Sequence, residues 1–251
     1  MTLSNRFKNT VDPSVLKNRK IALYTRFLDD PGEEKLAYII GAILGHHHQL
    51  ELTELIYTAC KEFVMNSTKA AIKRIVYDEM KLGSDGVEPD QEEFMRNFKS
   101  SILSQKFTYF KEKMKEKRIQ TKISFDFNSD RLIVRVSNNF ALLPKEESRI
   151  REKFQLARGY DNLPQFFLHH ADETEGAGLG ITLVGILMSQ YGMDRRLLTI
   201  YSEPKTNFTV ARLEIPFVAS YKSKRVLFEE ILSRENLTRE DLRNSWSLGA
   251  V

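Results

Sequence analysis

The chain has 251 residues, of which 41% are hydrophobic and 29% are charged, so it can build a sizeable core. A formal net charge of +4 is modest for this length and does not by itself indicate a nucleic-acid partner. The sequence shows no apolar run of about 18 residues and no signal peptide, so we expect a cytoplasmic protein without a membrane partner. The single cysteine excludes an internal disulfide.

The N-terminal part of the chain is polar and basic up to residue 31, and we treat it as a leader. Apolar residues then recur at helical spacing from Glu33 to Leu44, and Gly45 marks the end of this helix. The three histidines at 46–48 lie between this helix stop and the next helix start. We therefore expect them in a solvated loop.

A strongly helical stretch begins near Thr53 and carries three polar residues on one face. Glu62, Asn66 and Lys69 are spaced i, i+4 and i+7, so an acid, an amide and an amine lie together. An amide oxygen is a hard ligand suited to Mg²⁺, a carboxylate can orient water, and a Lys can meet phosphate. The combination suits Mg-ATP, and the alternative is an ordinary amphipathic helix with a polar outer face.

Residues 78–118 combine a glycine-containing loop, a helix and a lysine-rich run. Phe94, Phe98 and Ile102 repeat at i, i+4 and i+8, which predicts packing against a core. The charged run at 111–118 is typical of a solvated helix face. A docking surface for a partner protein is the alternative, since exposed aromatic residues often mark interfaces.

Two stretches have the period-two alternation of strands. The first runs from Ile123 to Val136 with a turn at 128–130, and the second runs from Leu198 to Ile215. Each predicts an antiparallel hairpin. Together with the helical stretches, they predict an α+β fold with helices on one face of the sheet.

The polar segment 144–175 leads into the run Glu175-Gly176-Ala177-Gly178-Leu179-Gly180, and an apolar helix follows. Glycines let the backbone approach a polyphosphate, and a helix N-terminus favours negative charge. No hydrophobic strand directly precedes the glycines and no Lys follows them, which excludes a dinucleotide fold and a P-loop. We expect segment 144–175 to be a mobile lid or a structural loop that covers the sheet.

These motifs together resemble the GHKL superfamily, the ATP-binding fold of sensor histidine kinases, anti-sigma serine kinases, gyrase and a class of heat-shock chaperones. Glu62-x-x-x-Asn66 is similar to its N-box, and Gly176-x-Gly178-Leu179-Gly180 is similar to its second glycine box. The resemblance covers residues 32–217. It implies a two-layer α/β sandwich of the Bergerat type, with an insertion at 78–118, a lid at 144–175, and helical additions at both termini, the second at 218–251.

The middle of the chain departs from the family pattern. Ser137 to Pro144 stands where the family has its Asp-x-Gly box, so Asn138 replaces the Asp that reads adenine, and Phe140 and Leu142 replace two glycines. Asn offers one acceptor oxygen and can take the same hydrogen bond at reduced strength. The two larger side chains could narrow the pocket, pack under the base or abolish binding.

The resemblance also implies roles for individual residues. Glu62 would be the catalytic base, and Asn66 would hold Mg²⁺. The remaining ATP-binding residues would be Lys69, Asn138, Gly176, Gly178, Leu179, Gly180 and Thr209.

The function implied is that of an ATP-binding signalling protein, either a Mg-ATP-dependent protein kinase acting on serine or histidine, or a regulatory ATPase. Glu at the first N-box position favours the serine kinase and ATPase branches. A protein partner or phosphoacceptor acting in trans is expected, a homodimer stays open, and no nucleic acid is expected. The alternative is a non-catalytic module for nucleotide sensing or protein interaction.

Overall fold

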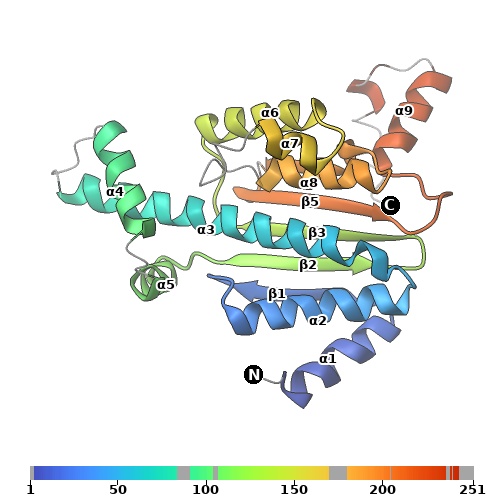
Figure 1. The fold of residues 1–251 in the computed structure, drawn as a ribbon, viewed down its shortest axis with the longest axis horizontal. Coiled ribbons are helices and arrows are strands. Elements are labelled where there is room, and N and C mark those ends of the chain that lie inside the picture. The colour runs from blue at the N-terminus through green and yellow to red at the C-terminus, as the bar shows by residue number, and fades with distance from the viewer. Residues whose placement is uncertain are drawn as a thin grey trace.

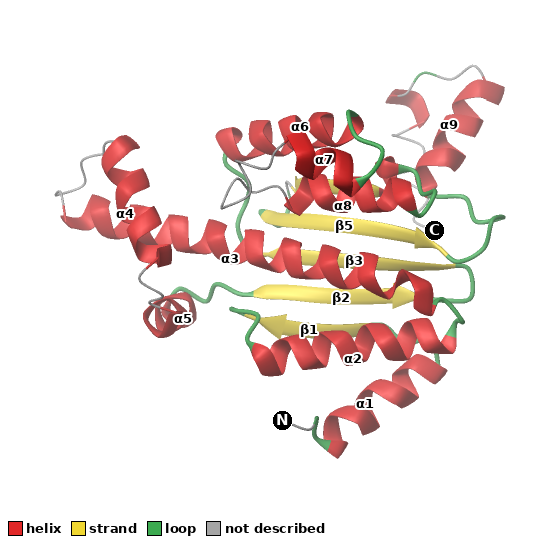
Figure 2. Ribbon diagram, viewed as in Figure 1, coloured by secondary structure: helices red, strands yellow, loops and turns green. Residues whose placement is uncertain are grey.

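The computed structural model describes residues 3–83, 91–103, 107–169, 180–203, 205–235, 238 and 240–242. This part of the chain combines helices with one antiparallel sheet, which confirms the α+β class (Figure 1, Figure 2). The elements are α1 (Asn5–Leu16), β1 (Ile21–Thr25), α2 (Asp30–His46), η1 (Leu50–Leu52), α3 (Thr53–Gly83), α4 (Gln91–Leu103), α5 (Phe107–Glu116), β2 (Thr121–Phe127), β3 (Arg131–Asn138), α6 (Pro144–Arg158), α7 (Leu163–His169), α8 (Gly180–Gln190), η3 (Arg195–Leu197), β4 (Leu198–Glu203), β5 (Phe208–Pro216) and α9 (Lys224–Glu235).

The sheet has the strand order β1-β2-β3-β5-β4 in the described part of the chain, and each neighbouring pair is antiparallel. Both expected hairpins form, since β2 pairs with β3 and β4 pairs with β5. Residues along β2 alternate between buried and half-buried, because successive side chains point to opposite faces. The pairing of β3 with β5 joins the two hairpins and sets Asn138 opposite Thr209.

The polar N-terminal stretch contributes two elements to the fold. α1 packs on α2, and its cap is Ser4, whose hydroxyl accepts a hydrogen bond from the Phe7 N–H. β1 pairs with β2 through Ile21 opposite Phe125 and forms one edge of the sheet. The sheet therefore begins ahead of the boundary drawn at residue 31.

Helices α2, α3 and α8 cover one face of the sheet (Figure 1). α2 begins at an Asp29 cap, whose carboxylate accepts from the Gly32 N–H at 3.1 Å, and it ends one residue beyond Gly45. The core between helices and sheet includes Leu36, Ile40, Leu55, Ile56, Phe63, Val184, Phe125, Val134 and Leu213. Fully burying one such side chain contributes roughly 1.5–3 kcal/mol relative to leaving it exposed.

Helix α3 begins at Thr53, as the sequence predicts, and continues to Gly83, past the ends of the neighbouring strands (Figure 1). We call the part of α3 from Ala71 onward, with α4 and α5, the arm. The arm has its own core, formed by Ala71, Ile72, Ile75, Val76, Phe98, Phe110 and Met114. Phe94 and Phe98 stack with ring centroids 6.4 Å apart, which confirms that these aromatics pack, whereas Phe107 and Tyr109 are exposed.

Segment 144–175 contains two helices in its described part. At the start of α6, Arg74 donates to both carboxylate oxygens of Glu146, at 3.3 and 2.9 Å. At its end, the Arg195 guanidinium donates to the carbonyl oxygens of Ala157 and Tyr160. Both ends of α6 are therefore tied to neighbouring elements.

The histidine triplet is only partly a solvated loop. His46 and His48 are exposed, but the His47 ring lies 5.2 Å from the Phe217 ring and 5.9 Å from the Phe127 ring, between centroids. Within the described residues, no group hydrogen-bonds the buried Nε2 of His47. Burial lowers the pKa of His47, and the neighbouring histidines add to this effect.

The chain after β5 forms α9, and a short stretch that includes a buried Leu242 follows. The rest of the expected helical addition, from residue 243 onward, lies outside the described residues. Across the ranges given above, no helix has both the length and the apolar character that crossing a bilayer requires.

We expect His47 to make the protein sensitive to mild acid. Its pKa in the folded state lies below the ordinary value of 6.5, so the folded state binds fewer protons than the unfolded state. The contribution of His47 to stability is therefore complete above pH 6.5 and is lost as the pH falls through its folded-state pKa. Urea denaturation from pH 7.5 to 5 should show this loss in full in the wild type, slightly less of it in exposed His46→Phe, which removes one neighbouring charge, and least of it in His47→Phe. Equal pH dependence in all three proteins would contradict the assignment.

Candidate functional site

The polar face of α3 forms as the sequence predicts. Glu62, Asn66 and Lys69 all lie within α3, at spacings that place them on one side of the helix, and each is half-buried. The opposite side of the helix is buried in the core. The three side chains therefore lie at the boundary between the core and the surface of the described structure.

Glu62 packs directly on Gly180, the first residue of α8. A Cβ added at Gly180 would lie 1.7 Å from Glu62 Oε2, 2.3 Å from Cδ and 2.8 Å from Cγ. A side chain at position 180 would therefore have to displace the end of the Glu62 side chain. This contact unites the predicted acid of α3 with the last glycine of the predicted glycine box.

Asn138 lies at the end of β3, in a row with Thr121 of β2 and Thr209 of β5. All three side chains are buried. The Asn138 Nδ2 donates to Ser67 Oγ of α3 at 3.1 Å, and Ser67 and Thr121 share a hydroxyl hydrogen bond of 2.7 Å. A buried polar cluster is therefore built from one helix and three strands.

The Oδ1 atom of Asn138 is buried, and no group among the described residues donates a hydrogen bond to it. A buried acceptor without a donor is costly, by about 1–3 kcal/mol. Such an atom in a folded protein calls for a water molecule or a ligand that donates to it. The neighbouring Thr209 hydroxyl donates to the Phe140 carbonyl oxygen at 2.7 Å and keeps an acceptor lone pair.

The loop after Asn138 is held by Arg74 of α3. The Arg74 guanidinium lies 4.0 Å from the centroid of the Phe140 ring and donates to the Ala141 carbonyl oxygen at 2.6 Å. Phe140 also packs against the core of the arm. The Leu142 N–H donates to Ser202 Oγ at 2.8 Å. The Phe140 side chain and the Leu142 backbone thus have defined positions.

Lys73 follows Lys69 by one turn on the same face of α3. Burial lowers the pKa of Lys73, the Glu146 carboxylate opposes this shift, and the positive charges of Arg149, Arg74 and Lys69 add to it. Cations of α3 and α6 therefore lie close enough to repel one another.

Lys153, one turn after Arg149 on α6, belongs to the same group. Burial lowers its pKa, the charges of Lys69, Arg149 and Lys73 lower it further, and the Glu62 carboxylate opposes them. Lys73, Arg149 and Lys153 are not among the site residues predicted from the sequence. The signal for the α6 pair was the four-residue spacing of two basic residues, but that spacing is common on solvated helices.

Several of the predicted ATP-binding residues belong to the glycine box. Gly176, Gly178 and Leu179 lie outside the described residues, as does the rest of the expected glycine box except Gly180. Among the residues that are described, no three His, Cys, Asp or Glu side chains gather into a group that could hold a metal ion. A metal at this site would therefore need ligands other than such a cluster.

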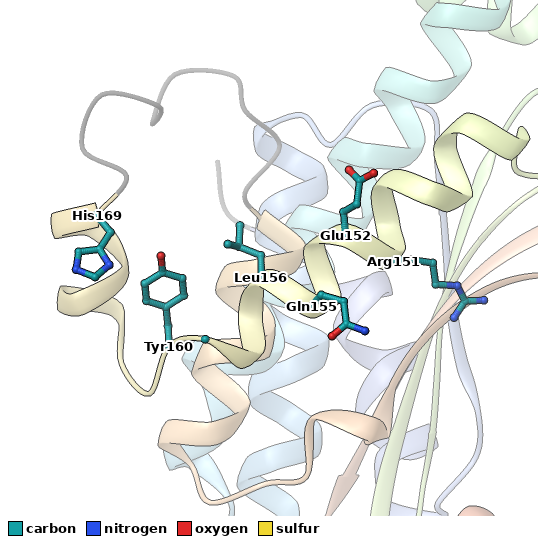
Figure 3. A pocket seen from close by; sticks show the side chains of 7 residues that line it. Arg151, Glu152, Gln155, Leu156, Tyr160 and His169 are labelled. Carbon is teal, nitrogen blue, oxygen red and sulfur yellow. The ribbon is translucent and has the colours of Figure 1, made fainter.

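A cavity of about 680 Å³ lies on another side of α6, against α7 (Figure 3). It is lined by Arg151, Glu152, Gln155, Leu156, Gly159, Tyr160 and His169. Leu156 points toward Tyr160 and His169, whose rings are 5.6 Å apart between centroids, whereas Arg151 points away (Figure 3). No residue predicted from the sequence lines this cavity, so it is separate from the candidate site.

Comparison with known proteins gives one distant relationship. The chain is 27% identical, over 197 residues, to an uncharacterized protein of Treponema pallidum. The match covers 78% of this chain but 37% of that protein, so the chain spans well under half of its relative. No family model matches the chain, and no solved structure does.

The contact between Glu62 and Gly180 predicts that substitutions at these two positions have coupled effects on the free energy of unfolding. An alanine in a helix interior is ordinarily favoured over glycine by about 0.5–1 kcal/mol, but Gly180→Ala must displace the end of the Glu62 side chain and should therefore gain less stability than this or none. In a Glu62→Ala background, where nothing has to move, the same change should be more favourable. A double-mutant cycle by urea denaturation measures this coupling, and additive effects would refute the contact.

Proposed function

We propose that this chain is an ATP-binding protein of the histidine kinase-like type, built on a Bergerat-type fold, which acts as a Mg-ATP-dependent protein kinase or regulatory ATPase. The observation that carries the proposal is the buried Oδ1 of Asn138, which lacks a donor among the described residues. It lies beside the polar face of α3, in the place where the family resemblance puts the adenine-reading carboxylate.

Asn138 fits a base that carries an amino group. Its amide donates to Ser67, which fixes the side chain with the oxygen available as an acceptor. The exocyclic amino group of adenine is a donor of the required kind. Thr209, the cross-strand neighbour of Asn138, offers a further hydroxyl at the same end of the sheet.

The α3 face fits the phosphate end of the nucleotide. Ser67, which binds Asn138, lies next to Asn66 and two residues before Lys69, so base and phosphate positions would be neighbours on one helix. Asn66 would supply an amide oxygen to Mg²⁺, and Lys69 would neutralise phosphate charge. The N–H groups at the start of α8 favour an anion beside Gly180. Bound Mg-ATP would supply the transferable phosphoryl group.

Glu62 would act as the general base. Its side chain is half-buried against Gly180, at the junction of α3 and α8, and Asn66 lies one turn further along the helix. A carboxylate held there can accept the proton of a water molecule or of a protein hydroxyl. In the kinase form of the proposal, a partner protein supplies that hydroxyl or a histidine in trans, and a homodimer stays open.

One observation favours the second candidate, a non-catalytic nucleotide-sensing or interaction module. Phe140 lies under the Arg74 guanidinium and packs against the arm, where the family keeps bare backbone. The loop beside Asn138 is therefore filled by side chains. A protein of this kind would bind a nucleotide, or a partner through the arm, without turnover.

The adenine assignment predicts a choice between bases. Isothermal titration with ATP and with inosine triphosphate, which has an oxo group in place of the amino group, should give at least about tenfold tighter binding of ATP. Asn138→Leu should remove this preference, while Asn139→Leu, whose exposed amide bonds to the backbone of residues 118 and 120, should keep it. Asn66→Ala should abolish the Mg²⁺ dependence of ATP binding. No binding of either nucleotide by the wild type would refute the proposal.

Glu62→Gln separates the two candidate functions. If Glu62 is the base, ATP hydrolysis or phosphotransfer should fall by about 10²-fold or more while ATP binding persists, because the amide cannot take up a proton. The measurement is steady-state release of ADP beside a binding titration. Turnover that is unchanged in the variant would exclude Glu62 as the base, and no turnover in the wild type would favour the non-catalytic module.

A further inference from the structure

A second cavity, of about 220 Å³, lies where the end of β1, the start of α2 and the arm helix α5 come together (Figure 1). We call it the α2–α5 cavity. It shares no residue with the candidate nucleotide site, and it is smaller than the roughly 300–1,000 Å³ of a typical site for an organic ligand. It is lined by Leu23, Tyr24, Thr25, Arg26, Phe27, Asp29, Gly32, Lys35 and Lys111.

The charged residues that line the α2–α5 cavity are mostly basic. Arg26 follows β1 directly, Lys35 belongs to α2 and Lys111 belongs to α5, so three separate elements supply the three positive charges. Asp29 supplies one negative charge. Three positive charges against one negative charge give the described lining a net charge of +2, and a small anion with two charges complements it.

The Arg26 guanidinium has no carboxylate partner within the described part of the chain. Its Nε atom is buried, and no acceptor among the described residues takes the Nε hydrogen, which is costly for a charged group. The Thr68 hydroxyl of α3 donates to the Arg26 carbonyl oxygen at 3.2 Å, so the backbone at this position is held. An anion bound to the terminal nitrogens would offset the cost, because the charge is shared over the whole guanidinium.

The two lysines of the α2–α5 cavity are only weakly engaged. Lys111 Nζ lies 3.4 Å from Asp29 Oδ2, and both side chains are 53% exposed, so this ion pair contributes little to stability. Lys35 Nζ lies 6.0 Å from the centroid of the Phe7 ring, and it pairs with no carboxylate among the described residues. An ammonium group has three N–H donors, so both lysines have donors left for a ligand.

Asp29 indicates which anion the α2–α5 cavity accepts. Its Oδ1 accepts a hydrogen bond from the Gly32 N–H at 3.1 Å, which caps α2 and fixes the carboxylate in the lining. A carboxylate only accepts hydrogen bonds, so it repels sulfate, which carries no proton. Inorganic phosphate near neutral pH keeps a proton and can donate it to a carboxylate oxygen in a hydrogen bond. Three cations with one fixed acceptor therefore favour hydrogen phosphate.

We propose that the α2–α5 cavity is a binding site for inorganic phosphate, in which the three basic side chains hold the dianion and Asp29 accepts a hydrogen bond from its remaining proton. This site is separate from the proposed nucleotide site and does not depend on it. Because Lys111 belongs to the arm, bound phosphate would join the arm to the start of α2.

The test is isothermal titration of the full chain with sodium phosphate and with sodium sulfate, near neutral pH and at constant ionic strength. The wild type should bind phosphate at least about tenfold more tightly than sulfate, since sulfate leaves Asp29 without a donor. Arg26→Met and Lys111→Met each keep an apolar stem and remove one charge. Each should bind phosphate about tenfold more weakly, because a charge-assisted hydrogen bond is lost.

Asp29→Asn distinguishes a role in recognition from a structural role. Asn caps a helix about as well as Asp does, so the start of α2 should persist. The amide nitrogen can donate to sulfate, and the preference for phosphate over sulfate should therefore fall towards unity. A preference that survives in this variant would overturn the recognition of the phosphate proton by Asp29.

Lys113→Met is the matched control on α5, because Lys113 does not line the cavity and pairs with Glu116 at 3.0 Å. It should bind phosphate as the wild type does. Absence of phosphate binding by the wild type at about 10 mM would overturn the inference. Unchanged phosphate affinity in both Arg26→Met and Lys111→Met would overturn it as well.

Lys69→Met separates this inference from the proposed function, because Lys69 belongs to the proposed nucleotide site. Phosphate binding should be unchanged in Lys69→Met, and ATP binding should be unchanged in Arg26→Met. Phosphate binding that is lost in Lys69→Met but kept in Arg26→Met would assign the ion to α3 and overturn this inference. Phosphate binding that depends on Arg26, in a protein that binds no ATP, would support this site and refute the nucleotide proposal alone.

Discussion

The apolar side of α3 must lie against the sheet, and this constraint decides where the polar side chains of the helix point. Leu55, Ile56 and Phe63 are buried in the core, and their burial gives the helix one orientation. Glu62 then contacts the start of α8, while Ser67 reaches the end of β3. The hydrophobic burial of α3 therefore sets the geometry of the candidate site.

The local elements of this fold follow from the sequence, and the long-range pairings do not. Period-two alternation predicts both hairpins because each strand lies next to its partner in the chain. β1 could not be predicted, since Ile21–Thr25 is short and its partner, β2, begins about a hundred residues later. The joining of the two hairpins through β3 and β5 has no local signal either. His47 shows the same limit, because its burial depends on Phe217.

In the candidate site too, the sequence predicts the local arrangement of residues but not the contacts between distant segments. The spacing of Glu62, Asn66 and Lys69 depends on helix geometry alone, which the sequence specifies. The contacts that connect this helix with other segments, such as Glu62 on Gly180 and Arg74 on Phe140, depend on tertiary packing. Phe140 is informative here. The sequence leaves open where its side chain lies, whereas in the structure its ring packs against the core of the arm.

Helix α3 belongs to two cores at once, one against the sheet and one in the arm. A helix of 31 residues is roughly 45 Å long, and α3 has its site residues near the middle. An α-helix is stiff over this length. A movement of the arm would therefore also move the part of α3 that carries the site residues. The arm and the junction of α3 with α8 are therefore connected by one continuous helix.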